Sequence, residues 1–435
     1  MTGTHISTTY LFAGGGTGGH IFPAIAIAEE LFRATDSALT VGGEREHTQQ
    51  NSGPSSDSTT DKQSLVGGTS VRCRFLVSQR PLDTKILQSQ TITVGDRAIS
   101  PDFVVIPAQP FGVRPKALLR FLNSWGKSVR TARRVIRSAK RDSNVVLIAM
   151  GGFVAAPCVQ AARAEKVPVI LVNLDAVPGK ANRWIARHAQ EIVTAAPIAP
   201  HLAKTSSFSH WKQIPPIVRR NATWTGSKRE ARIKLGLDPD RPTLMITGGS
   251  QGAGTINAFL RDFVSTSDIE QGSLHTGERT GWQILHQVGP QQAGSAIDEA
   301  LRTLYQEKNI PAVVSAFVND LGVWWGASDL AICRSGAGNV GEVWANKVPA
   351  IFLPYPFHKD EHQKFNAGTL EQSGGAIVLK DTANSENLRT VGPVLASLLK
   401  DPAKLAAMQA SLEKLGPANG TTQAALVISR IVLRS

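Results

Sequence analysis

The sequence contains few cysteines and no long apolar run. Its 435 residues include only Cys73, Cys158 and Cys333, which lie too far apart for a C-x-x-C metal knuckle or a disulfide framework. No apolar run reaches the roughly 18 residues that a membrane-spanning helix needs. The first ten residues also lack the basic start and the apolar core of a signal peptide. We therefore expect reduced, buried cysteines and a chain that stays in the cytoplasm.

Acidic residues are absent from one segment, which carries most of the net charge of +13. Ten basic residues and no acidic residue lie between Arg114 and Arg141. The segment also has an apolar stripe at helical spacing, formed by Leu118, Leu122, Trp125, Val129, Ala132 and Ile136. Basic side chains around apolar ones favour an anionic membrane surface as partner, and nucleic acid is disfavoured because no recognisable binding module accompanies the charge. An ordinary helix with its stripe in the core and its charges in solvent is the alternative.

Apolar residues are also missing from residues 44–64, where no Val, Ile, Leu, Met, Ala, Phe, Tyr or Trp occurs. Such a polar segment cannot bury enough surface to join a core. We expect a mobile surface insertion over residues 44–70, whose role the sequence does not reveal.

Glycine is abundant and gathers in loops that follow an apolar run and precede a helical pattern. In the first loop, five of the six residues from Gly14 to Gly19 are glycine. Bare backbone of this kind can approach a ligand closely, so the loop is a candidate cradle for a phosphate or a sugar. His20 follows on the first turn of the helix, where an imidazole can act as a general base near neutral pH. A capping or packing histidine is the alternative.

Two further glycine loops lie in the second half of the chain. The loop at 248–254 offers backbone N–H groups and the Ser250 hydroxyl at a helix N-terminus, which suits a phosphate. It has no Walker lysine, so nucleotide hydrolysis is a poor fit. The other loop begins at Cys333 and leads to Glu342, whose carboxylate can accept both hydrogens of a ribose diol. A glutamate on a helix surface is the alternative.

A polar segment at 354–367 mixes imidazole, amide and carboxylate side chains, a combination that suits sugar hydroxyl groups. His358 and His362 are four residues apart, but the sequence is not H-E-x-x-H, so we expect no metal site. Asp238 and Asp240 match a D-x-D pattern, yet they flank a proline just before an expected strand, which is typical of a turn.

Apolar runs alternate with helical patterns along the chain. Strands are expected at residues 38–41, 73–77, 103–106, 144–150, 168–172, 191–195, 243–247, 283–288, 312–315, 330–333, 350–353 and 376–379. This alternation predicts parallel, doubly wound α/β sheets. Because a strand, glycine loop and helix open each half, we expect two Rossmann-like domains facing a cleft.

Five segments occur in the order GGGTGGHIFPAIAIAEEL, MGGFVAAP, TGGSQGAGTIN, CRSGAGNVGEV and PYPFHKDEHQKFNA. Together they resemble the MurG family, GT-B glycosyltransferases of family 28 that act in bacterial cell-wall synthesis. The resemblance implies inverting, metal-independent transfer of GlcNAc from UDP-GlcNAc to the muramoyl 4-hydroxyl of lipid I, which gives lipid II without a cofactor. It also implies an acceptor domain at 1–218, a donor domain at 219–417 and a C-terminal helix over 418–435 that packs back on the acceptor domain.

The family's site residues carry over onto the matching positions. On the acceptor side, His20 and Thr17 would be catalytic, and the phosphate loop would comprise Gly16, Gly18, Gly19 and Asn182. On the donor side, the resemblance implies contacts from Arg219, Ser250, Gln251, Val318, Arg334, Ser335, Gly336, Ala337, Glu342, His362 and Gln363. The family's membrane patch falls on Leu118, Arg120, Phe121, Leu122, Trp125 and Lys127, which implies a peripheral protein on the cytoplasmic face of the membrane.

The chain departs from the family pattern at two places. Where the family has His-Glu-Gln-Asn, this sequence runs from Val172 to Asp175, and the family's Gly-Asn-Pro is replaced over residues 215–217. A different lipid or glycan acceptor and a homologue with reduced catalysis therefore stay open. A Rossmann oxidoreductase would need an acidic residue about 20 positions past the first glycines, where Glu44 only opens the polar segment. The sequence specifies neither the oligomeric state nor a partner among cell-wall enzymes.

Overall fold

The computed structural model describes residues 7–16, 18–44, 70–94, 97–112, 114–249, 253–266, 281–290, 292–357 and 361–432, and of residues 36–44 and 206 it describes only the backbone. Contacts divide the chain into two compact units. The first contains Met1–Asn173, Gly179–Val193 and Thr422–Ser435, and the second contains Leu174–Pro178 and Thr194–Thr421. This division falls near residue 194, whereas the resemblance implied a boundary after residue 218. Most of the polar segment at 44–70 lies outside the described residues.

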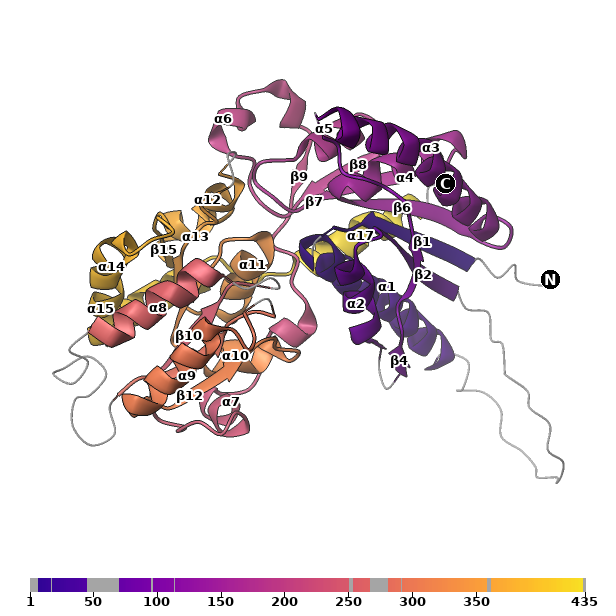
Figure 1. The fold of residues 1–435 in the computed structure, drawn as a ribbon. Helices are drawn as coiled ribbons and strands as arrows, with labels where there is room; N and C mark the ends of the chain where they lie inside the picture. Colours follow the sequence, from indigo (N-terminus) through magenta and orange to yellow (C-terminus); the bar gives the residue numbers. More distant parts are fainter. Residues whose placement is uncertain are drawn as a thin grey trace, which may run out of the picture. The chain divides into compact units, whose positions relative to one another are not determined.

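A parallel sheet forms the centre of the first unit (Figure 1). Its strands are β1 (Ser7–Gly14), β2 (Ser70–Val77), β5 (Asp102–Val105), β6 (Asn144–Gly151), β7 (Val169–Asn173) and β8 (Glu191–Thr194), in the spatial order β5-β2-β1-β6-β7-β8, and the two-residue β9 (Lys212–Gln213) completes the sheet. The chain reverses its direction of winding at β1, which pairs with β2 on one side and β6 on the other. Gly14 lies opposite Gly151 in that pairing, so the turns that follow β1 and β6 meet at one edge of the sheet.

Helices connect these strands. They are α1 (Gly18–Glu44), α2 (Pro81–Ser89), α3 (Pro115–Ala139), α4 (Gly152–Ala164) and α5 (Lys180–Ala186), and α17 (Gly420–Val432) returns from the end of the chain. Thr422 at the start of α17 donates a hydrogen bond to Glu30 of α1, and Figure 1 shows the two helices side by side in yellow and indigo. The strand expected at 38–41 is wrong, because α1 continues through it to Glu44. A small hairpin of β3 (Ile92–Val94) and β4 (Arg97–Ile99) was not expected.

The second unit has a parallel sheet of its own. Its strands are β10 (Thr243–Thr247), β11 (Gln283–Gln287), β12 (Ala312–Ser315), β13 (Leu330–Cys333), β14 (Ala350–Phe352) and β15 (Ala376–Val378), in the order β12-β11-β10-β13-β14-β15. Here β10 is the strand where the winding reverses, between β11 and β13. Thr247 pairs with Cys333, so the glycine loops after β10 and β13 emerge next to each other.

The helices of the second unit are α6 (Pro200–Ala203), α7 (Lys228–Lys234), α8 (Gly254–Thr266), α9 (Ala296–Glu307), α10 (Leu321–Ala327), α11 (Ala337–Asn346), α12 (His362–Asn366), α13 (Gly368–Ser373), α14 (Glu386–Thr390), α15 (Gly392–Lys400) and α16 (Pro402–Glu413), with 3-10 turns η1 (Ser206–Phe208) and η2 (Arg220–Ala222). On one side of the sheet α8, α9 and α15 contribute to an apolar core that includes Phe263 and Leu395. On the other side α10 and α11 pack around Trp325.

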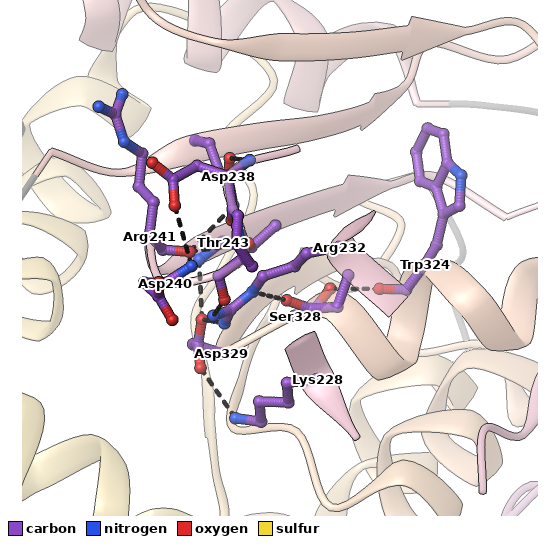
Figure 2. A network of polar contacts seen from close by, with 12 residues as sticks. Lys228, Arg232, Asp238, Asp240, Arg241, Thr243, Trp324, Ser328 and Asp329 are labelled. Atoms are coloured by element: carbon purple, nitrogen blue, oxygen red, sulfur yellow. Dashed lines mark hydrogen bonds and ion pairs between the residues drawn. The ribbon is translucent and has the colours of Figure 1, made fainter. Parts of the chain in front are cut away.

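A polar network holds the other end of this sheet, where β10 and β13 begin (Figure 2). Asp329 accepts hydrogen bonds from Lys228 (2.8 Å), Arg232 (2.5 Å) and the Thr243 N–H (2.8 Å). Nearby, the Asp240 N–H donates to the Asp238 carboxylate over 2.9 Å, which is the turn hydrogen bond expected of this D-x-D pattern. The network therefore serves the fold, because it lies at the opposite end of the strands from the glycine loops.

Two parallel-sheet α/β domains, each with a strand, glycine loop and helix where the winding reverses, confirm the predicted fold class. Most of the expected strands agree with the observed ones to within a residue or two at either end.

Candidate active site

A buried carboxylate holds the first glycine loop. The N–H of Gly16, at φ +91°, donates to Asp83 Oδ2 over 2.7 Å, and Ser78 donates to the same oxygen through its hydroxyl (2.6 Å) and its N–H (3.1 Å). Asp83 lies in the first turn of α2 and is fully buried. A Cβ at Gly15 would lie only 2.5 Å from Asp83 Oδ2, so the loop requires glycine at this point. The conformation of the loop therefore depends on a residue of another helix.

Arg80 contacts the same residue, Gly16, through its carbonyl group. Its Nη1 donates to the Gly16 carbonyl oxygen over 2.6 Å, and its guanidinium carbon lies 5.3 Å from the centre of the Phe153 ring. The residue as a whole is exposed. A cation with a fixed orientation thus lies beside the loop, although no sequence motif predicted it as a site residue.

His20 lies in the first turn of α1, against the turn that ends β6. A Cβ at Gly151, whose φ is +105°, would lie 3.1 Å from His20 Nε2 and 2.9 Å from Asn182 Oδ1. A Cβ at Gly152 would lie 3.5 Å from His20 Cε1. The glycine pair therefore leaves room for the imidazole and the amide together. Two of the residues predicted for the acceptor side, His20 and Asn182, are close neighbours in the structure.

One of the departures from the family pattern lies directly behind Asn182. The Asn182 amide donates to Asn173 Oδ1 over 2.9 Å, and both side chains are buried. Asn173 ends β7 and stands where the family has a glutamate, so the partner that orients Asn182 is a neutral amide in this chain. The Gly18 backbone is buried and Gly19 is exposed at the start of α1.

In the second unit, Glu342 and Arg219, which were both predicted for the donor side, lie close together. Glu342 is almost completely buried on α11, with Oε2 accepting from Trp325 Nε1 over 3.0 Å and Oε1 lying 3.6 Å from Arg219 Nη2. Burial raises the pKa of Glu342 above its ordinary value, and the charge of Arg219 only partly opposes this. Because each carboxylate oxygen can accept more than one hydrogen bond, Glu342 can also accept from a diol.

Arg334 was predicted to contact the donor, but its guanidinium forms its hydrogen bonds within the protein. Its guanidinium is buried, pairs with Asp381 over 2.7 Å and donates to Thr255 Oγ1 over 2.6 Å and to the Leu353 carbonyl oxygen over 2.7 Å. Burial acts to raise the pKa of Asp381, but hydrogen bonds and the charge of Arg334 outweigh it and lower that pKa. Arg334 therefore ties the loop after β13 to the start of α8 and the segment after β15.

Most of the remaining donor-side residues lie at the start of α11 or α12. Ser335 is fully buried and its Oγ has no hydrogen-bond partner among the described residues, while Gly336 caps α11 ahead of Ala337. Gln363 Oε1 accepts from the Tyr355 N–H over 2.9 Å, and His362 begins α12. Val318 follows the Phe317 carbonyl, which accepts from Ser315.

Asn366, buried at the end of α12, belongs to the motif at 354–367 but was not predicted as a site residue. Its amide donates to Asp175 Oδ1 (2.9 Å) and to the Ser335 carbonyl (3.3 Å), and its Oδ1 accepts from the Ala176 N–H (2.8 Å). Asp175 is one of the departures from the family pattern. Thr17, Ser250, Gln251 and His358 lie outside the described residues. The described part of the chain contains no group of three or more His, Cys, Asp or Glu side chains that could hold a metal ion.

The N-terminal half of α3, where the membrane patch was predicted, exposes apolar side chains. Leu119 and Leu122 are about three-fifths exposed, at 60% and 58%, whereas Ala132 and Ile136 in the second half are fully buried. Rings of Phe111, Phe121, Trp125 and Trp184 follow one another at centroid distances of 5.4, 5.3 and 6.5 Å. Arg133 and Arg137 at the other end both donate to Glu165 and lower the pKa of that carboxyl. None of the described helices is long and apolar enough to cross a membrane.

Comparison with known proteins identifies the family. The model of the glycosyltransferase family 28 N-terminal domain matches residues 10–48 and 67–194, and that of the C-terminal domain matches residues 243–427. A relative from Nocardioides is 30% identical over 98% of both chains, and one from Clavibacter michiganensis is 31% identical over 96% of this chain and 95% of its own. Both are named UDP-N-acetylglucosamine--N-acetylmuramyl-(pentapeptide) pyrophosphoryl-undecaprenol N-acetylglucosamine transferase. The chain belongs to this MurG family of glycosyltransferases.

Solved structures agree on the fold. The crystal structure of Acinetobacter baumannii MurG matches with a TM-score of 0.63 at 22% identity, covering 98% of this chain and 99% of its own. A UDP-GlcNAc 2-epimerase from Neisseria meningitidis matches with a TM-score of 0.53 at 12% identity, over 99% and 100% of the two chains. The GT-B prediction is confirmed, and membership of the MurG family makes the chain a glycosyltransferase, as predicted.

Proposed function

We propose that this enzyme transfers GlcNAc from UDP-GlcNAc to the muramoyl 4-hydroxyl of lipid I and so forms lipid II. The relatives that carry this activity in their names match nearly the whole chain, which is the observation that carries the proposal. In the reaction, the acceptor oxygen forms a bond to C1 of GlcNAc, the bond from C1 to the UDP oxygen breaks with inversion, and UDP leaves with the bonding pair.

On the acceptor side, His20 is the proposed base that takes the 4-hydroxyl proton. Its ring lies between the first glycine loop and the Gly151–Gly152 turn, beside Asn182. Asn182, which is held by Asn173, can hydrogen-bond the acceptor and fix its position relative to the imidazole. Thr17, on the same loop, stays a prediction.

On the donor side, Glu342 is proposed to accept hydrogen bonds from the ribose hydroxyl groups, with Arg219 beside it. The N-terminus of α8, which follows the loop after β10, stabilises negative charge on the departing diphosphate through its dipole and N–H groups. Gln363 and His362 are the proposed contacts of the GlcNAc hydroxyl groups. We propose that charge stabilisation of this kind suffices and that neither a metal ion nor a cofactor takes part.

UDP release by the purified enzyme tests this proposal, with and without a lipid I analogue and in the presence of EDTA. We expect release that depends on the analogue, survives EDTA and falls at least about 100-fold in His20→Ala, the scale of general-base catalysis. His210→Ala is the matched control, since His210 is an exposed histidine remote in sequence from the glycine loops. Release that needs a divalent cation, or a His20→Ala variant as active as His210→Ala, would contradict the mechanism.

A different lipid or glycan acceptor is the second candidate, and Asn173 and Asp175 are the observation that favours it. Both replace family residues, and both hydrogen-bond predicted or neighbouring site residues, Asn182 and Asn366. Comparing lipid I with simple glycolipids as acceptors separates the two candidates. A higher kcat/KM for another acceptor would favour the second.

We further propose that the exposed half of α3 places the enzyme on the anionic cytoplasmic face of the membrane. Within the described residues, Arg120 and Lys127 form no ion pair, whereas Arg137 pairs with Glu165. Because each basic residue near an anionic surface contributes about 1 kcal/mol, Arg120→Gln with Lys127→Gln should lower vesicle binding roughly 25-fold at low salt. Arg137→Gln is the control with an exposed but paired charge. Equal binding of all variants to anionic vesicles would refute the assignment.

A further inference from the structure

We infer that Arg80 is a further acceptor-binding residue, whose guanidinium binds a phosphate group of the acceptor beside the first glycine loop. This inference rests on the proposed function, because it takes the acceptor to carry a diphosphate. Arg80 lies directly before α2, within the matched N-terminal domain but outside the five sequence motifs and the predicted site residues.

The hydrogen bonds of the loop show why a cation is needed there. A glycine loop binds an anion mainly through its N–H groups. Here the N–H of Gly16 already donates to Asp83 over 2.7 Å. That donor is therefore not available to a ligand, and the loop has one fewer N–H group for a phosphate than its sequence suggested.

Asp83 also brings a negative charge to the loop. Its Oδ2 atom lies 2.7 Å from the Gly16 nitrogen, and its Oδ1 atom is buried without a hydrogen-bond partner among the described residues. A carboxylate in this position repels an approaching phosphate. A neighbouring cation offsets that repulsion, and Arg80 donates to the carbonyl oxygen of the same residue, Gly16.

The guanidinium of Arg80 is already oriented to bind a phosphate. One N–H group is used by the Gly16 carbonyl oxygen, and the Phe153 ring packs against the group at 5.3 Å. These two contacts fix its orientation while the residue stays exposed. The remaining N–H groups can therefore bind two phosphate oxygens with little further loss of side-chain freedom. Arg80 thereby places the phosphate beside the loop that precedes His20.

The test uses geranyl diphosphate, a water-soluble prenyl diphosphate without a sugar, and the full-length enzyme. Calorimetry on the wild type, Arg80→Ala, Arg80→Lys and Arg80→Gln should show a dissociation constant raised about tenfold or more in the Ala and Gln variants, as for the loss of a charged hydrogen bond. Lysine should give an intermediate value, because it keeps the charge without the planar fork. Arg80→Gln removes the charge but keeps a donor for the Gly16 carbonyl oxygen. It therefore separates loss of phosphate binding from loss of the loop conformation.

Arg72→Ala is the matched control, since Arg72 lies on β2 in an exposed ion pair with Asp142 and away from the carboxyl end of the strand. In turnover assays, Arg80→Ala should raise the KM of the lipid I analogue by a similar factor and leave the KM of UDP-GlcNAc unchanged. Binding to anionic vesicles should not change. Wild-type affinity for geranyl diphosphate in the Ala and Gln variants would overturn the inference, as would a loss confined to vesicle binding.

The two proposals fail in different ways. A wild-type enzyme that binds geranyl diphosphate through Arg80 but does not glycosylate the lipid I analogue would refute the proposed function alone. Turnover of the analogue with an acceptor KM that is the same in wild type and Arg80→Ala would refute only the role of Arg80.

Discussion

Replacing Glu342 with glutamine should separate donor binding from stability. The carboxylate is almost completely buried, accepts from Trp325 over 3.0 Å and lies 3.6 Å from Arg219. Glutamine has the same shape and keeps an oxygen that can accept from Trp325. It loses the charge and one of the two acceptor oxygens, which a ribose diol needs for both of its hydrogens.

The expected loss in donor affinity follows from the hydrogen bond that disappears. A hydrogen bond to a charged group contributes about 1.5–3 kcal/mol, so the dissociation constant of UDP should rise about 10- to 150-fold. The free energy of unfolding should stay within about 1 kcal/mol of the wild type or increase, because burial disfavours the charged form of Glu342 more than its partners favour it. Glu342→Ala is different, since it leaves the buried Trp325 N–H without an acceptor and should cost about 1–3 kcal/mol.

Calorimetric titration with UDP and chemical unfolding of the same samples measure both quantities. Titration with 2′-deoxy-UDP provides the decisive control, because a ligand without the 2′-hydroxyl should discriminate much less between wild type and Glu342→Gln. An undiminished ratio for the deoxy ligand would show that Glu342 acts elsewhere than on the ribose. Equal losses of stability in the Gln and Ala variants would refute the argument about the buried charge.

Two further predictions concern pH and stability. The pKa of Glu342 is raised in the folded state, so the folded chain binds more protons than the unfolded chain above pH 4.5. The contribution of Glu342 to the free energy of unfolding should therefore fall as pH rises from 4.5 through the raised pKa. The pH dependence of unfolding should differ between the wild type and Glu342→Gln only in that window. UDP affinity should fall on acidification through the same window in the wild type and not in the variant. Asp329→Ala breaks the network of Figure 2 and should lower the free energy of unfolding by about 3–5 kcal/mol. Asp240→Ala removes only an exposed ion pair and should lower it by less than about 1 kcal/mol. Denaturant titration of both variants checks this, and equal losses would contradict it.

The sequence predicted what depends on local pattern. Apolar runs predicted the strands, and the glycine-rich segments between apolar runs and helical patterns predicted the loops. Both predicted sheets are present. The strand expected at 38–41 failed because a helix that has already formed continues more easily than a short run of β-favouring residues can end it.

The contacts that shape the site could not be predicted in the same way. Asp83 is 67 residues from Gly16, and nothing in its own neighbourhood marks it as the residue that holds the loop. Arg334 was assigned to the donor because its loop resembles the family's, but its ion pair with Asp381 joins positions 47 residues apart. Such pairs depend on how elements pack and not on their local sequence.

Gly338 on α11 offers a final test of the difference between a glycine needed by the fold and one left for a ligand. A Cβ at Gly338 would meet no atom of the described residues within 4 Å, whereas a Cβ at Gly341, one turn further, would lie 3.0 Å from the Pro216 Cβ and 3.1 Å from Val218. Gly338→Ala should therefore stabilise the fold by about 0.5–1 kcal/mol, because alanine is the better helix former.

If the donor substrate approaches this turn of α11, the added methyl group should hinder it. Gly338→Ala should then bind UDP-GlcNAc more weakly while unfolding at a higher denaturant concentration. Gly341→Ala should be destabilised instead, since its methyl group would press on Pro216. A Gly338→Ala variant with higher stability and unchanged donor affinity would show that the donor does not reach this position. Opposite signs of stability and affinity at Gly338 would mean that glycine is kept there for the ligand at the expense of the helix.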